Sequence, residues 1–245
     1  MQKENIIISL GGSLVAPNDI DVGFLKNFRH SIVKYLNPEI KPLALNGASS
    51  NPSALLRARR FFVFVGGGKV CRNYQKALSE FGADNKEKDW IGINVSRLNA
   101  EVVKQSFDKI CFDKVITDPT KKVNSRRDLV VFAGWKPGWS TDYCSVALAK
   151  NMGIKTIINL TNIDYIYDKD PNKFPNAKPL KEINWREFRK LVGDKWAPGL
   201  SMPFDPRASK MAEILKIKVI MVNGKHLERL EDFLNSKPFL GTIIQ

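Results

Sequence analysis

The stretch TIINLTNIDYIYDKDP, residues 156–171, decides the fold class of this chain. Its first part, 156–160, is a short apolar segment that predicts a buried strand, and a dense polar turn follows it directly. A buried parallel strand with such an ending places the turn at the carboxyl edge of a sheet, where open α/β folds bind their ligands. Asn, Asp and Pro are also ordinary turn formers, so the stretch is compatible with a binding role and with a plain turn.

Further apolar segments and helical patterns alternate on both sides of this stretch. The predicted strands are 5–10, 61–65, 129–133, 156–160 and 219–222. The predicted helices are 22–36, 70–81, 91–107, 141–149, 185–192, 205–215 and 226–234. This alternation indicates βαβ units in a three-layer α/β/α sandwich with a central, mostly parallel sheet. No linker or repeat is evident, so we expect one domain over residues 1–245, with a surface loop at 37–53.

The composition limits the classes of function. The chain has 245 residues, of which 43% are hydrophobic, and a formal net charge of +14. An excess of Lys and Arg attracts the phosphates of nucleotides or nucleic acids. The basic residues are scattered, however, and no helix-turn-helix, zinc-finger or RNP-like pattern accompanies them. A basic solvated surface is therefore favoured over specific nucleic-acid binding.

The sequence also indicates the compartment. No apolar run approaches the roughly 20 residues that span a bilayer, and no signal peptide is visible at residues 1–5. Cys71, Cys111 and Cys144 are far apart and match neither a disulfide framework nor a metal site. We therefore expect a cytoplasmic protein without a membrane partner, whose cysteines are reduced and partly buried.

Two glycine turns follow predicted strands, Gly11-Gly12-Ser13 and Gly66-Gly67-Gly68. Glycine lets the backbone approach a phosphate closely, and free N–H groups at the start of a helix favour an anion. Neither turn has the spacing of a P-loop or of a dinucleotide-binding fingerprint. Each turn taken singly is therefore also compatible with a tight βα connection that needs glycine for its geometry.

A third loop, Lys136-Pro137-Gly138-Trp139-Ser140-Thr141-Asp142, precedes a predicted helix. The hydroxyls of Ser140 and Thr141 suit a helix cap and equally suit a phosphate. Asp142 can orient a lysine or a metal-bound water, or it can favour the helix N-terminus through the macrodipole. The residues leave these roles open.

Taken in this order, these segments resemble the amino acid kinase superfamily, and within it the uridylate kinases, over nearly the whole chain. The matching segments are 11–13, 66–69 with Arg72, 89–93, 96–100, 137–142, 161–171 and 205–210. The first strand lacks a lysine, which is more similar to the archaeal-type enzymes than to the common bacterial ones. The resemblance implies phosphoryl transfer from ATP to UMP with Mg²⁺, in pyrimidine nucleotide biosynthesis. It also implies a hexamer built from dimers.

The resemblance further implies roles for individual residues. Residues 1–150 would form the acceptor half and residues 151–245 the ATP half. Asp142 and, more weakly, Lys210 would be catalytic. The ATP-binding residues would be Gly12, Ser13, Gly68, Arg72, Thr161, Asn162, Tyr167 and Asp170. The UMP-binding residues would be Gly67, Asp89, Trp135, Lys136, Pro137, Gly138, Trp139, Ser140 and Thr141.

This reaction suits a site made of strand ends. Phosphoryl transfer needs positioning and charge neutralisation more than covalent help. Backbone N–H groups supply fixed dipoles, and no general base is required because the attacking phosphate of UMP is already anionic. We therefore expect several strand ends to converge on one trough that holds two nucleotides end to end.

Some residues depart from the family pattern. Ser9 and Asn162 stand where many members carry lysines. The missing charge must then come from Mg²⁺ and from cations such as Lys69, Arg72 or Lys210. Tyr165 replaces a usual small residue and narrows the ATP pocket. The bulky Trp135 and Trp139 either stack on uracil or alter the choice of acceptor.

Three other readings remain open. Isopentenyl phosphate kinases use a histidine near the second glycine turn, whereas His30 and His226 of this chain lie on predicted helices away from the motifs. Carbamate and acetylglutamate kinases would be expected to keep the first-strand lysine. A non-catalytic nucleotide- or oxyanion-binding protein, similar to the molybdenum storage proteins, would tolerate its loss.

Overall fold

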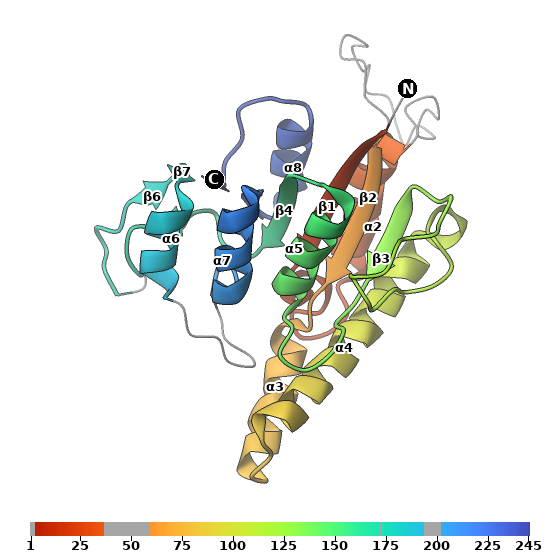
Figure 1. Cartoon of the computed structure of the whole chain (residues 1–245), viewed down its shortest axis with the longest axis horizontal. Helices are drawn as coiled ribbons and strands as arrows, with labels where there is room; N and C mark the ends of the chain where they lie inside the picture. Colours follow the sequence, from red (N-terminus) through yellow and green to blue (C-terminus); the bar gives the residue numbers. More distant parts are fainter. Residues whose placement is uncertain (1–2, 37–58, 172, 194–201) are drawn as a thin grey trace.

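The computed structural model describes residues 3–36, 59–171, 173–193 and 202–245 (Figure 1). The predicted surface loop at 37–53 lies outside these residues. The helices are α1 (Gly12–Val15), α2 (Val22–Leu36), α3 (Gly68–Glu80), α4 (Asn85–Ser106), α5 (Thr141–Met152), α6 (Trp185–Val192), α7 (Pro206–Leu215) and α8 (Leu227–Leu234), with a 3₁₀ turn at Asp108–Ile110. The strands are β1 (Glu4–Leu10), β2 (Arg59–Val65), β3 (Leu129–Phe132), β4 (Thr156–Thr161), β5 (Ile166–Tyr167), β6 (Pro179–Leu180), β7 (Glu182–Ile183), β8 (Lys218–Asn223) and β9 (Thr242–Ile244).

A seven-stranded sheet in the order β3-β2-β1-β4-β8-β9-β7 forms the middle layer. The strands β3, β2, β1, β4 and β8 are mutually parallel, whereas β9 runs antiparallel to β8. Parallel strands end at the same edge of a sheet, so the segments that follow these five strands meet there. The predicted fold class, with its mostly parallel central sheet, is confirmed.

Helices cover both faces of the sheet, which explains why its strands are almost continuously apolar. Ile6 and Ile8 of β1 face α2, α4 and α8, whereas Ile7 belongs to the cluster on the other face, with α5, α6 and α7. The three cysteines are buried and unpaired, as the sequence predicts. The arrangement places the two apolar layers on opposite sides of one sheet.

The predicted start of α4 is wrong. The helix begins at Asn85 rather than near residue 91, because Asp84 accepts a hydrogen bond from Glu87 N and Glu87 accepts one from Asp84 N, each at 2.8 Å. This capping box puts Asp89 on a helix instead of in a loop. Figure 1 shows α3 and α4 together projecting beyond the sheet.

Four short strands were not predicted from the sequence. β9 pairs with β7 and β8 at one side of the main sheet, and β5 pairs with β6 in a separate hairpin. Each has two or three residues, and β7 and β9 depend on partners distant in the chain. Local periodicity could not reveal them.

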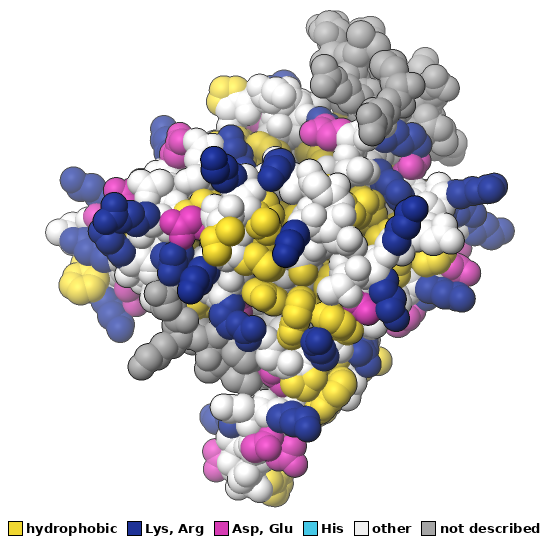
Figure 2. Space-filling model, in the orientation of Figure 1, with side chains coloured by type: hydrophobic (Ala, Val, Ile, Leu, Met, Phe, Trp, Pro, Cys, Tyr) yellow, Lys and Arg dark blue, Asp and Glu magenta, His cyan; other side chains and the backbone are white. Residues whose placement is uncertain are grey.

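The distribution of surface charge and the hydropathy of the helices concern two classes that the sequence disfavours, nucleic-acid-binding proteins and membrane proteins. In Figure 2 the Lys and Arg side chains are distributed over the visible face, with Asp and Glu among them, and do not form one stripe. Across the described ranges, no helix combines the length and apolarity needed to cross a bilayer.

Candidate active site

The carboxyl ends of β1, β2, β3 and β4 meet along one edge of the sheet. Gly11 N donates to Leu160 O and Gly66 N donates to Leu10 O, both at 2.9 Å, so the strand ladder continues into the glycine turns. Two adjoining cavities open there. We call the first, of about 240 Å³, the glycine cavity, and the second, of about 210 Å³, the loop cavity. The predicted convergence of strand ends is thus present.

The two glycine turns pack directly against each other. A Cβ atom on Gly12 would overlap the carbonyl oxygen of Gly66, and one on Gly68 would overlap the backbone of Gly12. Gly68 also has φ +67°, a conformation that residues with side chains rarely adopt. Glycine is therefore required at these two positions by the backbone itself, whether or not a phosphate is bound.

The glycine cavity brings together most of the predicted ATP-binding residues. It is lined by residues of both glycine turns, the end of β1 and the end of β4. Six of the predicted residues lie in its wall: Gly12, Ser13, Gly68, Arg72, Thr161 and Asn162. Ser9 and Asn159 line it as well, and the sequence had not singled out Asn159.

The remaining part of the polar turn is mainly structural. Tyr167 lies in the β5–β6 hairpin opposite Pro179, and neither Tyr167 nor Asp170 lines the glycine cavity. Asp168 Oδ1 accepts a hydrogen bond from Lys178 N at 2.8 Å. Asp164 accepts one from Asn223 Nδ2 at 3.0 Å and pairs with Arg229. For these two aspartates the plain turn interpretation holds.

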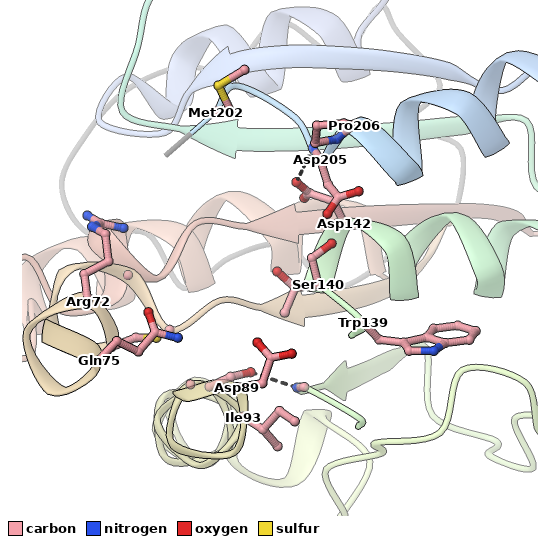
Figure 3. A pocket seen from close by; sticks show the side chains of 17 residues that line it. Arg72, Gln75, Asp89, Ile93, Trp139, Ser140, Asp142, Met202, Asp205 and Pro206 are labelled. Carbon is pink, nitrogen blue, oxygen red and sulfur yellow. Dashed lines mark hydrogen bonds between the residues drawn. The ribbon is translucent and has the colours of Figure 1, made fainter. Parts of the chain in front are cut away.

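The loop cavity contains five of the predicted UMP-binding residues, Gly67, Asp89, Trp139, Ser140 and Thr141 (Figure 3). Asp89 Oδ2 accepts a hydrogen bond from Gly138 N at 2.6 Å, which ties α4 to the loop before α5. Desolvation raises the pKa of Asp89, and the hydrogen bond from Gly138 opposes this shift. One carboxylate oxygen of Asp89 is thereby used within the protein.

Aromatic residues of the loop at 134–140 and of the first turn of α5 pack on one another. Trp135 and Tyr143 each meet Trp139 edge to face, with ring centroids 4.6 Å apart. The ammonium group of Lys136 lies 4.0 Å from the Trp135 ring centroid. Figure 3 shows the indole of Trp139 directed away from Asp89. The predicted residues Trp135, Lys136, Pro137 and Gly138 do not line the loop cavity.

The two cavities share one wall. Its residues come from α3, from the start of α5 and from the segment before α7: Gly67, Gly68, Arg72, Thr141, Asp142 and Met202. Arg72 Nη2 donates a hydrogen bond to Ser13 Oγ at 3.3 Å, so its guanidinium reaches the first glycine turn. A group bound in either cavity therefore faces the same cation.

Asp142 is the acidic residue of this wall. Ser9 Oγ donates to its Oδ1 at 2.9 Å, and Asp205 N donates to its Oδ2 at 3.2 Å. Desolvation and the charge of Asp205 raise the pKa of Asp142 to about 7, despite these two hydrogen bonds. No Lys or Arg within the described part of the chain forms an ion pair with it.

The hydroxyl of Ser140 serves as a helix cap. It accepts a hydrogen bond from Tyr143 N at 3.0 Å, and it also bonds Asp205, whose carboxylate caps α7 through Ala208 N at 2.7 Å. Desolvation raises the pKa of Asp205. Ser140 is therefore the N-cap of α5, and the carboxylate of Asp142 does not cap this helix.

Two predicted sources of positive charge are not in the shared wall. Lys210 is exposed on α7 beside Tyr143 and Ile214, because Ala208 and Ser209 take the buried positions of that turn. Lys69 Nζ donates to Asn18 at 2.7 Å. Of the three cations considered from the sequence, Arg72 is the one that lines both cavities.

Polar residues of α4 hold the strand ends in place, a role that the sequence did not reveal. Ser96 Oγ donates to Val65 O at 2.7 Å and accepts from Gly134 N at 2.8 Å. Asn99 Nδ2 donates to Gly66 O at 2.9 Å, and Arg97 donates to Trp135 O at 3.0 Å. The signal was present, since these polar residues interrupt an otherwise apolar helix face.

The carboxylates at the boundary of the two cavities fit magnesium. Mg²⁺ prefers hard oxygen ligands and is usually bound through one or two carboxylates together with substrate phosphates. The carboxylates of Asp142, in the shared wall, and Asp205, which lines the loop cavity beside it, are close enough to raise the pKa of Asp142. Among the described residues no cation pairs with Asp142, and a divalent cation would offset its charge. Among the described residues there is no group of three or more metal-ligating side chains, as a protein-only metal site would need.

Comparison with known proteins agrees with this geometry. The model of the amino acid kinase family matches residues 4–223. The uridylate kinase of Methanospirillum hungatei is 33% identical over 98% of this chain and 94% of its own. That of Pyrococcus abyssi is 29% identical over 95% and 96%. The crystal structure of uridylate kinase from Archaeoglobus fulgidus has a TM-score of 0.75 and 26% identity, covering 98% and 99% of the two chains.

The matched residues include every strand of the parallel part of the sheet and both glycine turns. Likeness to an amino acid kinase, expected from the motifs, is thus established over most of the sequence. The chain belongs to the amino acid kinase family.

Proposed function

We propose that this chain is a uridylate kinase that transfers the γ-phosphate of ATP to UMP and releases UDP and ADP. The observation that carries the proposal is the wall shared by the two cavities, which contains Arg72, Thr141 and Asp142. Direct transfer between two phosphates requires two nucleotide sites with a common boundary. The archaeal relatives named uridylate kinase support UMP as the acceptor.

We assign ATP to the glycine cavity and UMP to the loop cavity. Residues 1–150 then supply most of the acceptor half, and residues 151–245 supply the end of β4 and the segments around the ATP base. Gly12, Ser13, Thr161 and Asn162 face the ATP phosphates and sugar in this assignment. Tyr167 and Asp170 remain predicted contacts of the adenosine.

On the acceptor side, Asp89 receives hydrogen bonds from the ribose of UMP, and Gly67, Ser140 and Thr141 border its phosphate. Gly138 acts indirectly, because its N–H orients the Asp89 carboxylate. Trp135, Lys136, Pro137 and Trp139 belong to the same loop, and Trp139 borders the cavity. The packing of the two indoles on each other supports a shaping role more than direct stacking on uracil.

The chemistry follows from charge and position. The phosphate of UMP is already anionic and attacks without a base. Arg72 offsets negative charge at the junction, and the backbone of the glycine turns supplies fixed dipoles toward the transferring group. Asp142 and Asp205 would hold Mg²⁺, which when bound supplies the positive charge that lysines provide elsewhere in the family.

An ADP-release assay tests the proposal. The enzyme is incubated with ATP and Mg²⁺ and with UMP, CMP, isopentenyl phosphate or no acceptor. We expect turnover with UMP and little with the other acceptors. Binding of ATP without turnover of any acceptor would instead support a storage or sensor protein, and turnover of isopentenyl phosphate would support the other kinase class.

Two details of the proposal concern assembly and location. We place the enzyme in the cytoplasm, in pyrimidine nucleotide biosynthesis, and we propose a homo-oligomer, with a hexamer as the expected state. Exposed apolar side chains on and between α3 and α4 support self-association: Tyr74, Phe81, Trp90 and Leu98. Light scattering measures the mass in solution, and a monomer at micromolar concentration would contradict the assembly.

A further inference from the structure

Gln75 on α3 is a buried polar residue that the proposed reaction does not yet use. Its side chain is 8% exposed and lines the loop cavity. Nε2 donates to Lys88 O at 3.0 Å, which fixes the orientation of the amide. Oε1 is buried and has no hydrogen-bond partner within the described residues. A buried amide oxygen without a donor is costly, so it points to a partner that is absent from the ligand-free chain.

The position of Gln75 indicates which part of a nucleotide supplies this donor. Gln75 lies one helical turn from Arg72, about 4.5 Å along the axis of α3. If the acceptor phosphate lies at Arg72, in the wall of both cavities, the neighbouring part of the nucleotide is its ribose. Figure 3 shows Gln75 beside Asp89, which is the predicted ribose contact.

The numbers of donors and acceptors agree with this placement. A ribose offers two adjacent hydroxyl donors, at the 2′ and 3′ positions. Within the described residues, one carboxylate oxygen of Asp89 is engaged by Gly138 N and the other is left, and the amide oxygen of Gln75 has no donor. Two acceptors on neighbouring helices therefore stand beside the cavity that would hold two donors.

We propose that Gln75 Oε1 accepts a hydrogen bond from one ribose hydroxyl of the acceptor nucleotide, while Asp89 accepts one from the other. Gln75 is then a specificity-determining residue that favours a nucleotide with both ribose hydroxyls over an analogue that lacks the hydroxyl it contacts. This inference rests on the proposed UMP kinase function for its choice of nucleotide. A site built to bond a hydroxyl rejects an analogue that lacks it, since its own buried group is left unpaired.

The test is an equilibrium titration of UMP, 2′-deoxy-UMP and 3′-deoxy-UMP against wild type and Gln75→Met, with Gln105→Met as the control. Gln105 is exposed on α4 and lines neither cavity. We expect wild type and the control to bind each deoxy analogue about 10- to 100-fold more weakly than UMP. In Gln75→Met the penalty for one analogue should fall below about threefold, and the other penalty should remain.

Unchanged penalties for both analogues in Gln75→Met would overturn the inference, even if all three ligands bound more weakly, because a purely structural role affects them equally. If Gln75→Met does not fold, wild type alone decides: equal binding of UMP and both analogues would overturn the inference, whereas two penalties would support it. If wild type bound no UMP, the proposed function itself would be contradicted. If Gln75→Met, but not wild type, failed to discriminate UMP from one deoxy analogue, this inference would be supported.

Discussion

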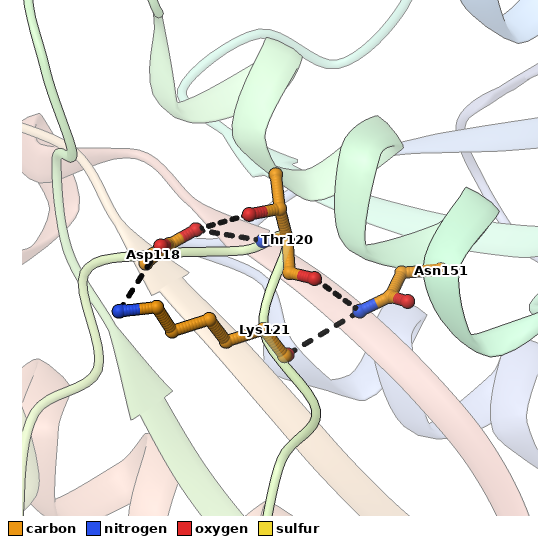
Figure 4. A network of polar contacts seen from close by, with 4 residues as sticks. All are labelled: Asp118, Thr120, Lys121 and Asn151. Carbon is orange, nitrogen blue, oxygen red and sulfur yellow. Dashed lines mark hydrogen bonds and ion pairs between the residues drawn. The ribbon is translucent and has the colours of Figure 1, made fainter.

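Two aspartates at opposite ends of α5 differ in how the protein treats their charge. Asp118 lies near the carboxyl end of the helix, where Thr120 donates to it from its backbone N at 3.0 Å and from its hydroxyl at 2.6 Å (Figure 4). Lys121 lies 3.7 Å away, and Asn151 of α5 holds the same loop through two backbone carbonyls. Desolvation raises the pKa of Asp118, but these partners outweigh it and the net shift is downward.

Asp142, in the first turn of the same helix, has two hydrogen bonds and no cation within the described residues, and its pKa rises to about 7. The comparison separates a carboxylate that stabilises the fold from one whose charge is left uncompensated. An acid with a strongly shifted pKa in a cavity is a candidate functional residue. A bound cation would offset the unfavourable free energy of its buried, uncompensated charge. In our account Mg²⁺ and Arg72 provide positive charge near Asp142, whereas the charge of Asp118 is already compensated within the protein.

The largest expected effect concerns the cation of the shared wall. Arg72→Gln should lower kcat/KM for UMP phosphorylation by about 100- to 1,000-fold, because it removes the charge that both cavities share. Lys69→Gln is the matched control on the same helix, since Lys69 contacts Asn18, and it should change kcat/KM less than about threefold. Steady-state kinetics measure kcat/KM for both variants. Equal changes in the two variants would contradict a specific role of Arg72 in the site.

The direct comparison pairs Asp142→Asn with Asp118→Asn. We expect Asp142→Asn to lower kcat about 100-fold yet to raise the stability of the ligand-free protein at pH 8 by about 1–2 kcal/mol. The amide can keep both hydrogen bonds if Ser9 rotates its hydroxyl to accept. Asp118→Asn should leave kcat unchanged and should cost less than about 1 kcal/mol.

Turnover assays and thermal melts measure these four values. If Asp142→Asn were destabilised and as active as wild type, the residue would be structural and the two ends of α5 would not differ in kind.

The same comparison predicts opposite pH trends of stability. The folded pKa of Asp142 is about 7, above the usual value near 4 of an unfolded chain, so the folded form binds the extra proton between these values. The stability of wild type relative to Asp142→Asn should therefore fall as pH rises from about 4 to 7 and should level off above 7.

For Asp118 the folded pKa is lowered, so its contribution is present above the unfolded pKa and is lost as pH falls. Denaturant titrations in EDTA between pH 3 and 8 measure the two differences, with the Asp118 contribution lost below about pH 4 and the Asp142 trend seen between about pH 4 and 7. If the difference in free energy of unfolding between wild type and Asp142→Asn stayed constant with pH, the charge of Asp142 would be compensated within the folded protein.

The smallest effect is expected at Lys210. Its exposed position on α7 predicts that Lys210→Ala changes kcat and KM less than about twofold. This substitution tests whether the catalytic role implied by the resemblance should be dropped. A loss of more than tenfold in kcat would show that α7 moves Lys210 toward the shared wall during turnover.

Much of this fold is readable from the sequence because its signals are local. The mostly apolar runs at 5–10 and 61–65 predict buried parallel strands, and the glycines after them mark the turns. The start of α4 was also a local signal, in Asp84 and Glu87, but the prediction did not use it. The strands β7 and β9 had no local signal, since their pairing is set by the rest of the sheet.

The site was predictable in its segments and less so in its individual side chains. Arg72, Asp89 and Asp142, which the motifs singled out, line the two cavities, because strand ends in a parallel sheet must converge. Whether Lys210 or Trp139 points inward depends on helix rotation and on packing between loops. The role proposed for Gln75 could not be predicted from the sequence for a similar reason. It depends on how α3 packs against α4, which pairs Nε2 with Lys88 O and leaves Oε1 without a partner among the described residues.

The central claim is that one trough holds two nucleotides end to end, with Arg72 and Asp142 between them. Its most direct test is the affinity of an adenosine and a uridine joined by a polyphosphate chain that spans both cavities. We predict that this linked ligand binds at least 100-fold more tightly than ATP or UMP, since its second half binds intramolecularly. If it binds no more tightly than ATP, and UMP competes with ATP for one site, the account is contradicted.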